Sequence, residues 1–403
     1  MAMQDTNFYN TNHPDYLRLS FAANMIRYAP NGTAPLFGLT GMLSKPGKAM
    51  AVEHGYFAKT MLFPEATLDG AIADGVTTAF TVTDTSKLVV GDLLRVQTTG
   101  EIIRVQTITN ATDIVVLRGV GQIAAAAIAD TTKLYGVGNA FEQGSLRPAS
   151  RLMNPVRVLN HTQIFRNSWA LPKTAKVVAP IVGGTLDAES RQDCALLHSA
   201  DIEKALIFGQ KSGQIVNGQY MTTMDGIVET VRRLAPAGNT NTAGATTDYK
   251  QLEAMLNPVF DTIANGRDGN NRLIFVGGSA RTVINDIGRF SGQYQIQDGQ
   301  TSFGLQFQTF KTSRGTFRMI EHPLFNSNTD WSKLAVAVEL SSMKLCYLVG
   351  RETENIEYGM DGKATDDGID AVGGTLTTEL TMEITNPSAN AVIWGLTEGV
   401  AEP

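Results

Sequence analysis

The chain has 403 residues, of which 43% are hydrophobic and 18% are charged, with 39 Gly and 14 Pro. At roughly 100–200 residues per domain, this length predicts two or three domains with a sizeable core, and the composition excludes collagen-like and disordered proteins. The formal charge of −6 provides no basic excess for a DNA backbone, so we do not expect a sequence-reading DNA-binding protein.

The N-terminal part of the chain predicts an extended arm. Residues 1–35 are mostly polar, apart from an apolar patch that contains Leu17, Phe21 and Met25. Residues 30–46 are rich in Pro and Gly, which interrupt periodic pairing and favour a segment that crosses a surface. A segment with so little to bury by itself is expected to need a partner.

Residues 67–138 predict short β-strands, because Thr, Val and Ile dominate and Gly, Asp and Asn supply the turns. We predict a small all-β insertion or a long, elaborated β-hairpin here, and a further β segment over 156–171. The predicted strands of the insertion are 79–82, 93–96, 101–108, 114–117 and 132–137.

The most regular helical pattern covers residues 186–209. Thr185 can cap its N-terminus and Gly209 can end it. Asp187 and Glu189 lie in the first turn, where the helix dipole favours negative charge. Apolar residues occupy more than one face, so we expect a central helix with structure packed on both flanks.

Downstream of this helix, helices alternate with strands, which favours a compact α/β domain followed by closing strands. A loop rich in Gly, Asn and Thr is expected over 236–247. The predicted helices are 226–234, 249–264 and 280–287, and the predicted strands are 272–276, 306–310, 316–321, 334–338, 344–348 and 374–384.

Two short motifs are similar to enzyme signatures. Gly119 and Gly121 fit a dinucleotide-binding pattern, but the helix that could follow is too short to cross back over a parallel sheet, which favours a turn between strands. Ser279 fits the start of a nucleophile elbow with His322 as a distant base. Arg281 replaces the last glycine of that elbow, which favours Ser279 as a helix N-cap.

Other chemistry-bearing patterns are weaker. The acidic loop 361–370 places Lys363 where a calcium ligand is needed, and no P-loop spacing occurs. The five histidines show no paired spacing, so we assign no zinc site, and His198 is expected to be a packing residue or an inter-subunit contact. Cys194 and Cys346 predict small core residues of a reduced, intracellular protein. We expect no catalytic residue, cofactor, export signal or membrane span.

Six segments follow one another in order along most of the chain: 91–96, 101–105, 114–119, 160–165, 201–206 and 375–387. The first begins with Gly91-Asp92 and a hydrophobic run, the second with Glu101 and a hydrophobic run, and the third ends in Arg118-Gly119. Together they resemble the major capsid proteins of tailed bacteriophages, in the branch that carries a β-rich insertion near the N-terminal third.

The resemblance implies an α+β fold of the Hong Kong 97 type, with an N-terminal arm, an E-loop, a peripheral domain with a long spine helix, an axial domain and an extra small β insertion. The implied parts are an N-terminal arm over 1–40, an E-loop region over 41–155 with its insertion at about 67–138, a peripheral domain over 156–222 with the spine helix at about 186–209, an axial domain over 223–330, and closing strands of both domains over 331–403.

The resemblance also implies a shell subunit. Because the arm and the β-rich loop have too little to bury on their own, we expect them to lie on neighbouring copies of the chain. The expected inter-subunit contacts are Leu17, Phe21, Met25, Arg95, Glu101, Arg104, Arg118, Glu142, Arg147, Arg151 and His198.

The implied function is a major capsid protein of the virion head, which self-assembles in the host cytoplasm into hexamers and pentamers of an icosahedral shell. The shell would enclose double-stranded DNA without sequence-specific contacts, with portal and scaffolding proteins as partners and a decoration protein as a further candidate. The alternatives are a cellular nanocompartment shell of the same fold and, in another class, a serine hydrolase using Ser279 or a nicotinamide-dependent enzyme using Gly119 and Gly121.

Overall fold

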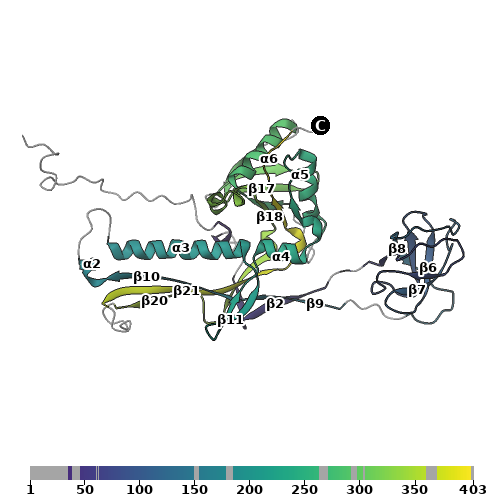
Figure 1. The fold of residues 1–403 in the computed structure, drawn as a ribbon, viewed down its shortest axis with the longest axis horizontal. Helices are drawn as coiled ribbons and strands as arrows, with labels where there is room; N and C mark the ends of the chain where they lie inside the picture. Colours follow the sequence, from purple (N-terminus) through teal and green to yellow (C-terminus); the bar gives the residue numbers. More distant parts are fainter. Residues whose placement is uncertain are drawn as a thin grey trace, which may run out of the picture. The chain divides into compact units, whose positions relative to one another are not determined.

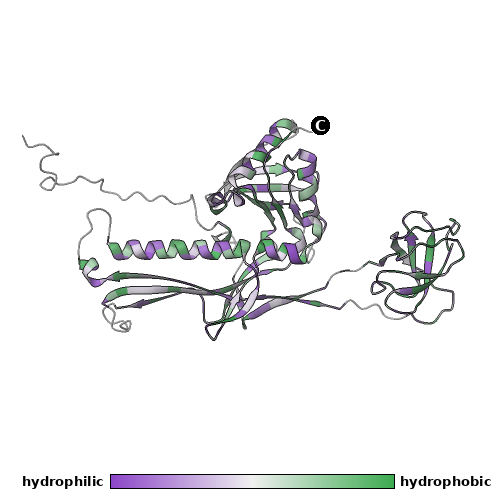
Figure 2. Cartoon of the chain, viewed as in Figure 1, coloured by the Kyte–Doolittle hydropathy of each residue, from purple (hydrophilic) through white to green (hydrophobic). Residues whose placement is uncertain are grey.

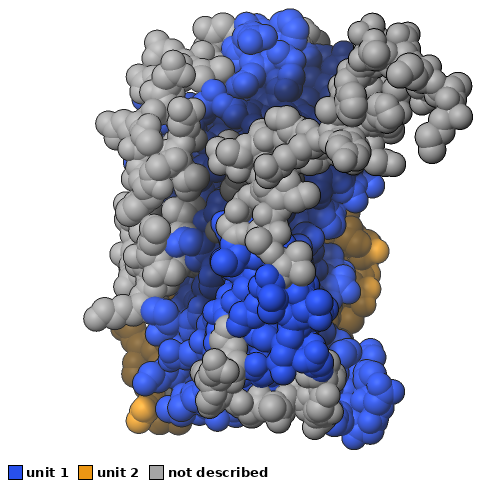
Figure 3. Space-filling view, turned by 90° about the vertical axis from the view of Figure 1, so that its left-hand side faces the viewer, with its two compact units in different colours: residues 1–56, 159–403 blue, residues 57–158 orange. Residues whose placement is uncertain are grey.

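A computed structural model of the chain describes residues 35–38, 46–59, 61, 63–148, 154–177, 185–262, 271–291, 297–302, 305–359 and 370–400. The chain divides into two compact units (Figure 3). Unit 1 comprises residues 1–56 and 159–403, and unit 2 comprises residues 57–158. Within the described ranges, no helix combines the length and the apolar character needed to span a bilayer.

Unit 2 is a six-stranded antiparallel sheet with the order β3-β8-β5-β6-β7-β4. An isolated bridge joins Leu68 to Val82, beyond the ends of the two edge strands, and the Thr83 amide donates to the Thr67 carbonyl at 2.9 Å, so the sheet closes into a small barrel. The five predicted strands are confirmed, and β3 was not predicted. The strands are β3 (Glu65–Thr67), β4 (Ala79–Thr81), β5 (Asp92–Val96), β6 (Ile102–Ile108), β7 (Asp113–Leu117) and β8 (Lys133–Asn139).

The barrel of unit 2 has its own hydrophobic core. Along β6, Ile103 and Val105 are buried while their neighbours are partly exposed, which is the alternation of a strand with one face on a core. The expectation that this segment cannot bury its own apolar residues is therefore wrong, because closure of the sheet creates an interior. The buried residues are Ala66, Leu68, Phe80, Val82, Leu88, Leu94, Val96, Ile103, Val105, Ile114, Val116, Ile128 and Leu134.

Unit 1 contains a sheet of order β1-β19-β21-β10, with β20 also paired to β21. The long helix α3 (Leu186–Phe208) runs along β10 and β21 (Figure 1). The predicted β segment 156–171 is divided into two strands, β9 (Val156–His161), which pairs with β2 (Glu53–Ala58), and β10. The strands of the sheet are β1 (Gly47–Ala49), β10 (Gln163–Pro172), β19 (Met343–Leu348), β20 (Glu354–Tyr358) and β21 (Ala371–Ile384), and the short helix α2 (Lys173–Val177) follows β10.

Helix α3 forms where it was predicted, but its surroundings differ from the expectation. Hydrophilic and hydrophobic residues alternate along it (Figure 2), and Cys194, His198 and Ile202 are buried at four-residue spacing. In the same half of the helix, Leu197 is 62% exposed, so packing on both flanks is wrong for this part of α3 within the described structure. Thr185 occupies the N-cap position, but its side chain makes no capping hydrogen bond.

The C-terminal end of α3 depends on two glycines. Gly209 has a φ of −56°, so it does not end the helix through a left-handed conformation. A Cβ on Gly209 would instead lie 2.5 Å from the Ala205 carbonyl oxygen, and one on Gly226 would lie 2.7 Å from the Gly209 nitrogen. The absence of side chains lets Gly226 donate to the Gly209 carbonyl at 2.8 Å and start α4 (Ile227–Leu234), as predicted, beside the end of α3.

A second sheet of unit 1 has the order β13-β22-β18-β14-β17-β16-β15, and its strands β14 and β18 are buried on both faces. Along β14, Leu273 and Phe275 pack with α3 and α4, whereas Ile274 and Val276 pack with α5 (Tyr249–Leu256) and α6 (Gly278–Ser291). The strands are β13 (Thr240–Thr242), β14 (Asn271–Val276), β15 (Gln297–Ser302), β16 (Leu305–Lys311), β17 (Thr316–Glu321), β18 (Ala335–Val338) and β22 (Ala391–Trp394).

The α+β fold class is confirmed, but several elements of unit 1 differ from the prediction, and β1, β2, β15, β20 and α2 were not predicted. The helix predicted over 249–264 ends at Leu256, because Pro258 lacks the amide needed to continue it and starts the 3₁₀ turn Asn257–Phe260. The loop predicted over 236–247 contains the strand β13. A hairpin between α3 and α4, formed by β11 (Ser212–Val216) and β12 (Gln219–Thr223), was not predicted.

Candidate functional site

The β11–β12 hairpin presents apolar side chains that contact little else in the described part of the chain. Ile215 lies opposite Tyr220 in the register, and these residues are 76% and 63% exposed. On the other face of the hairpin, Val216 and Met221 are also exposed. An exposed apolar surface on both faces of a hairpin is typical of a site that packs against another protein.

The base of this hairpin is held firmly, while its tip projects. The Thr222 hydroxyl donates to the Thr162 carbonyl at 2.6 Å, and Asp225 accepts from the Lys211 amide at 2.6 Å. At the tip, Asn217 and Gly218 have φ values of 51° and 77°, as a two-residue hairpin turn requires. The Asn-Gly pair between β-favouring residues is the sequence signal that could have predicted the hairpin.

Two of the predicted inter-subunit contacts, Glu101 and Arg118, form a buried ion pair inside unit 2. The Glu101 side chain has no exposed surface, and the Arg118 Nη2–Glu101 Oε2 distance is 2.7 Å. Burial acts to raise the pKa of Glu101, but hydrogen bonds from Arg118 and Gly119, together with the Arg118 charge, hold that pKa below its ordinary value. In this conformation the pair is buried within the barrel, and its role as an inter-subunit contact stays a prediction.

The other predicted contact residues of unit 2 lie nearer its surface. Arg104 Nη1 is 2.8 Å from the exposed Glu142 carboxylate, and Arg104 Nε donates to the Ala140 carbonyl at 2.9 Å. Arg95 and Arg147 are exposed. Their role as inter-subunit contacts therefore stays a prediction. The remaining predicted contacts Leu17, Phe21, Met25 and Arg151, and most of the acidic loop 361–370, lie outside the described residues.

His198 is a packing residue, which is one of its two predicted roles. Its Nδ1 lies 2.7 Å from Asn167 Oδ1 and its Nε2 lies 2.8 Å from Thr378 Oγ1, so it joins α3 to β10 and β21. Since the Asn167 amide nitrogen donates to Asp201, its oxygen accepts from His198 Nδ1–H. Burial lowers the pKa of His198 against an opposing effect of Asp201, which favours the neutral ring.

A second buried histidine connects three parts of unit 1. His322 Nε2 lies 2.8 Å from Glu203 on α3, and neither side chain has exposed surface. Glu203 also accepts from the backbone amides of Leu36 and Phe37 at 2.7 and 2.8 Å. One carboxylate therefore fixes the helical turn at 35–38 to α3 and to the end of β17, and the Leu36 side chain is buried in the core.

The enzyme-like motifs have structural roles. Ser279 lies within the first turn of α6 and is not its N-cap, and its Oγ is 2.6 Å from Ser332 Oγ. His322, the base of the hypothetical elbow, contacts Glu203 instead. The segment after Gly121 is irregular and not helical, and Gly119 donates to Glu101 at 3.0 Å, so the turn interpretation is confirmed.

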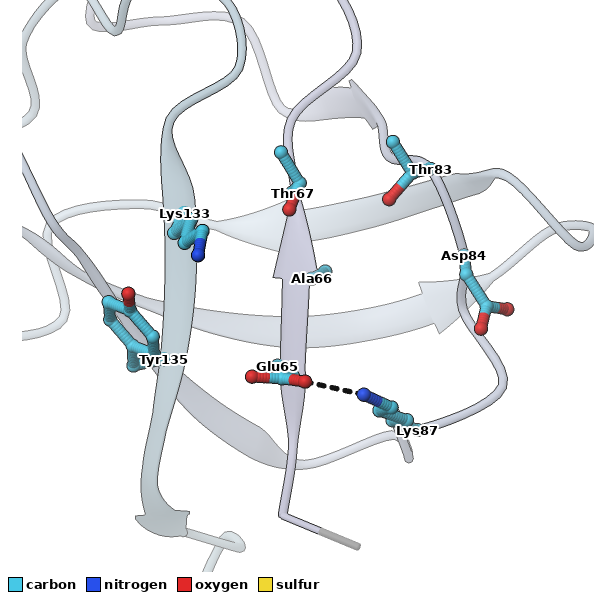
Figure 4. Close-up of a pocket in the computed structure, with 8 residues that line it drawn as sticks. All are labelled: Glu65, Ala66, Thr67, Thr83, Asp84, Lys87, Lys133 and Tyr135. Carbon is cyan, nitrogen blue, oxygen red and sulfur yellow. Dashed lines mark hydrogen bonds and ion pairs between the residues drawn. The ribbon is translucent and has the colours of Figure 1, made fainter. Parts of the chain in front are cut away.

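A shallow depression lies between β3, β8 and the segment after β4 in unit 2 (Figure 4). Its volume of about 150 Å³ is below the roughly 300 Å³ at which small-molecule pockets begin. Glu65 and Lys87 form an ion pair across it. We therefore interpret the depression as a surface groove and not as a cofactor site.

Three side chains of types that bind metals meet in unit 1. His54 Nε2, Cys346 Sγ and a carboxylate oxygen of Glu383 all lie within 4.8 Å of one another. Cys346 is buried and forms no disulfide, and burial, reinforced by the Glu383 charge, raises the pKa of its thiol to about 11. Cys194 is also a buried free thiol, as predicted.

Two solved structures illustrate the structural similarities of the chain. A chain of the structure described as Microbacterium phage Oxtober96 is 10% identical, with coverage of 98% of this chain and 100% of that chain and a TM-score of 0.47. The SrpI encapsulin complex from Synechococcus elongatus is 10% identical, with coverage of 62% of this chain and 81% of that chain and a TM-score of 0.42.

The similarities in sequence extend over nearly the whole chain. The family described as SU10 major capsid protein matches residues 3–397. The major capsid protein of Pseudomonas phage PaMx41 is 38% identical over 402 residues, which cover 96% of this chain and 95% of that protein. Because a capsid family and a capsid protein of 38% identity both match nearly the full length, the chain belongs to the SU10 major capsid protein family.

Proposed function

We propose that this capsid protein self-assembles through a Hong Kong 97-type fold into pentamers and hexamers of an icosahedral head that encloses double-stranded DNA. Membership of a capsid family over residues 3–397 is the observation that carries this proposal. The order of elements supports it, since α3 fits the spine helix, the sheet of β14 and β17 fits the axial domain, and unit 2 fits the β insertion of the E-loop region.

The exposed hairpin supplies a reason for assembly. Ile215 and Tyr220 form a cross-strand apolar pair in contact with water in the single chain, and removing apolar surface from water stabilises association by about 25 cal/mol per Å². A small buried area on each subunit is sufficient to stabilise a shell, because the free energies of the contacts repeated over a closed shell add up. No catalytic residue is needed for this function, and we propose that the protein is not an enzyme.

The proposed partners follow from the shell. Portal and scaffolding proteins would act during assembly in the host cytoplasm, a decoration protein could bind the finished surface, and the packaged DNA would meet a chain with a formal charge of −6. Such a charge gives weak, sequence-independent contact with phosphates. The N-terminal arm over 1–40 and the E-loop region over 41–155 are proposed to reach neighbouring copies.

Expression of the full chain, with and without the scaffolding protein of the same phage, tests the proposal. Electron microscopy and sedimentation should show shells, tubes or capsomer rings. A chain that stays monomeric at high concentration with scaffold present would refute it. Double-stranded DNA in native particles would distinguish a phage head from a nanocompartment shell, which would contain a cargo enzyme. A fluorophosphonate probe that labels Ser279 would support the hydrolase alternative instead.

A further inference from the structure

The side chains of His54, Cys346 and Glu383 converge in unit 1 although they come from three different strands. His54 Nε2 lies 3.1 Å from Glu383 Oε2, and Cys346 Sγ lies 3.9 Å from the same oxygen. Donor atoms around a tetrahedral zinc ion are separated by about 3.3–3.5 Å, given metal–ligand distances of about 2.0 Å to N and O and about 2.3 Å to S. Both separations are therefore within about half an ångström of those in a metal site.

The sheet places these ligands on one face. In the antiparallel register of β19 and β21, Glu383 lies opposite Lys344, and Cys346 is two residues further along β19, so Cys346 and Glu383 are diagonal neighbours. His54 is supplied by β2, a strand outside this sheet. A nearby hydrogen bond at 2.6 Å from the Tyr56 hydroxyl to the Ile384 carbonyl fixes β2 against the end of β21.

The space around the sulfur depends on a glycine. Gly47 pairs with Cys346 in the parallel register of β1 and β19, and a Cβ on Gly47 would lie 2.4 Å from Cys346 Sγ. Gly47 does not have a positive φ, so its conformation alone does not require glycine. A residue with a side chain at position 47 would push the Cys346 sulfur away from its present position beside Glu383.

We propose that His54, Cys346 and Glu383 form a binding site for a divalent transition metal of the zinc class, with a fourth position filled by water. A thiolate and an imidazole select zinc over magnesium or calcium, and three protein ligands with one open position are common in zinc proteins. As the metal binds, the Cys346 thiol loses its proton to solvent, and His54 binds through Nε2 with its remaining ring proton on Nδ1, so the contacts of both groups with Glu383 Oε2 are replaced by bonds to the ion.

The surroundings permit this binding. Cys346 is buried, and the side chains of His54 and Glu383 keep 20% and 18% of their surface exposed, so an ion can enter from the solvent side. Lys344 is the neighbouring cation, with its ammonium group 3.4 Å from the position of a Cβ on Gly47. Its side chain is exposed and can turn into solvent as the ion enters. The bound ion would tether β2 to the sheet of β19 and β21.

Binding of Co²⁺ to the full-length protein tests the proposal, because Co²⁺ reports tetrahedral geometry and thiolate ligation in its absorption spectrum. We expect one Co²⁺ per chain, a sulfur-to-cobalt charge-transfer band, and displacement of Co²⁺ by Zn²⁺. Cys346→Ser should abolish the charge-transfer band, and Glu383→Gln should weaken the apparent affinity by at least about tenfold. Absence of the band in the wild-type protein would overturn the proposal.

Cys194→Ser is the matched control, because Cys194 is the other buried free thiol and packs with Trp169 and Val372. This variant should bind Co²⁺ as the wild type does, and loss of the band only in Cys194→Ser would contradict the assignment. A second measurement tests the site even if Cys346→Ser alters the fold. Zn²⁺ should slow hydrogen exchange of β2 in the wild-type protein and leave it unchanged in Cys346→Ser, and equal slowing in both would refute the site.

Discussion

Removal of the Glu101 carboxylate by Glu101→Gln is expected to destabilise unit 2 selectively. Glu101 has no exposed surface and accepts from Arg118 Nε at 3.0 Å, from Arg118 Nη2 at 2.7 Å and from the Gly119 amide at 3.0 Å. Breaking a buried ion pair from one side costs about 3–5 kcal/mol, because the remaining charge is left buried. Arg118 keeps the Asp74 and Ala126 carbonyls as acceptors, so the cost should lie near the lower end, about 3 kcal/mol.

Hydrogen exchange of the full-length protein, followed by mass spectrometry, measures this effect in each unit separately. A loss of about 3 kcal/mol should accelerate exchange of the most protected amides of β5, β6 and β7 about 100-fold, while the sheet of β14 and β17 keeps its protection. Acceleration that is equal in both units, or less than about threefold in unit 2, would refute the reasoning that this pair stabilises only the barrel.

The control for this experiment is Glu142→Gln, which removes the partner of Arg104. The Glu142 side chain is 65% exposed, so solvent screens the pair and exchange should change little. The double variant Glu101→Met with Arg118→Met replaces both charges by apolar groups and should recover most of the protection. A double variant as labile as Glu101→Gln would show that the carboxylate, and not the unpaired arginine, decides the stability.

Three further expectations follow from unit 1. Gly226→Ala should lower the free energy of unfolding in urea by about 1–3 kcal/mol, because the added methyl group meets three backbone atoms within 2.8 Å. The control is Gly38→Ala, which adds a methyl group to open space and should have little effect. The pKa of His198 in the folded protein lies below the ordinary value of 6.5, so the free energy of unfolding should fall as the pH falls from about 6.5 towards that lower pKa. His198→Gln should remove this dependence. If the pH dependence of unfolding is the same in His198→Gln, the neutral buried ring is contradicted. The double variant Ile215→Ser with Tyr220→Ser should leave the unfolding midpoint of the single chain unchanged but reduce shell formation in sedimentation, and normal shells would show that the hairpin is not an assembly surface.

Local pattern was a good guide where a strand has one buried face. The strands of unit 2 lie in a segment dominated by Thr, Val and Ile and punctuated by Gly, Asp and Asn turns, so β4 to β8 could be predicted close to their bounds. The closure of that sheet could not be predicted, because it depends on a bridge between Leu68 and Val82 and on the edge strand β3, which is only three residues long. Because this closure was not predicted, the β-rich segment was expected to have no hydrophobic core of its own.

Residue type was a poor guide to which charged side chains are exposed. Glu101 and Arg118 were expected to contact neighbouring subunits, which requires side chains that are accessible on the single chain. The antiparallel sheet instead brings them together in the interior, where each satisfies the other. His198 was left between a packing residue and a subunit contact, and its neighbours on β10 and β21 decide for packing.

Periodicity and residue type were enough to predict the position of α3 and most strands, and the resemblance to phage capsid proteins implied the α+β class, because both depend on segments that are continuous in the chain. Which distant side chains meet depends on the packed structure. The carboxylate of Glu203 joins residues 36, 37 and 322, and the His54, Cys346 and Glu383 cluster needs the register of β19 with β21. Register and strand order are set by the packing of the whole core, so no local pattern of residues could specify these contacts.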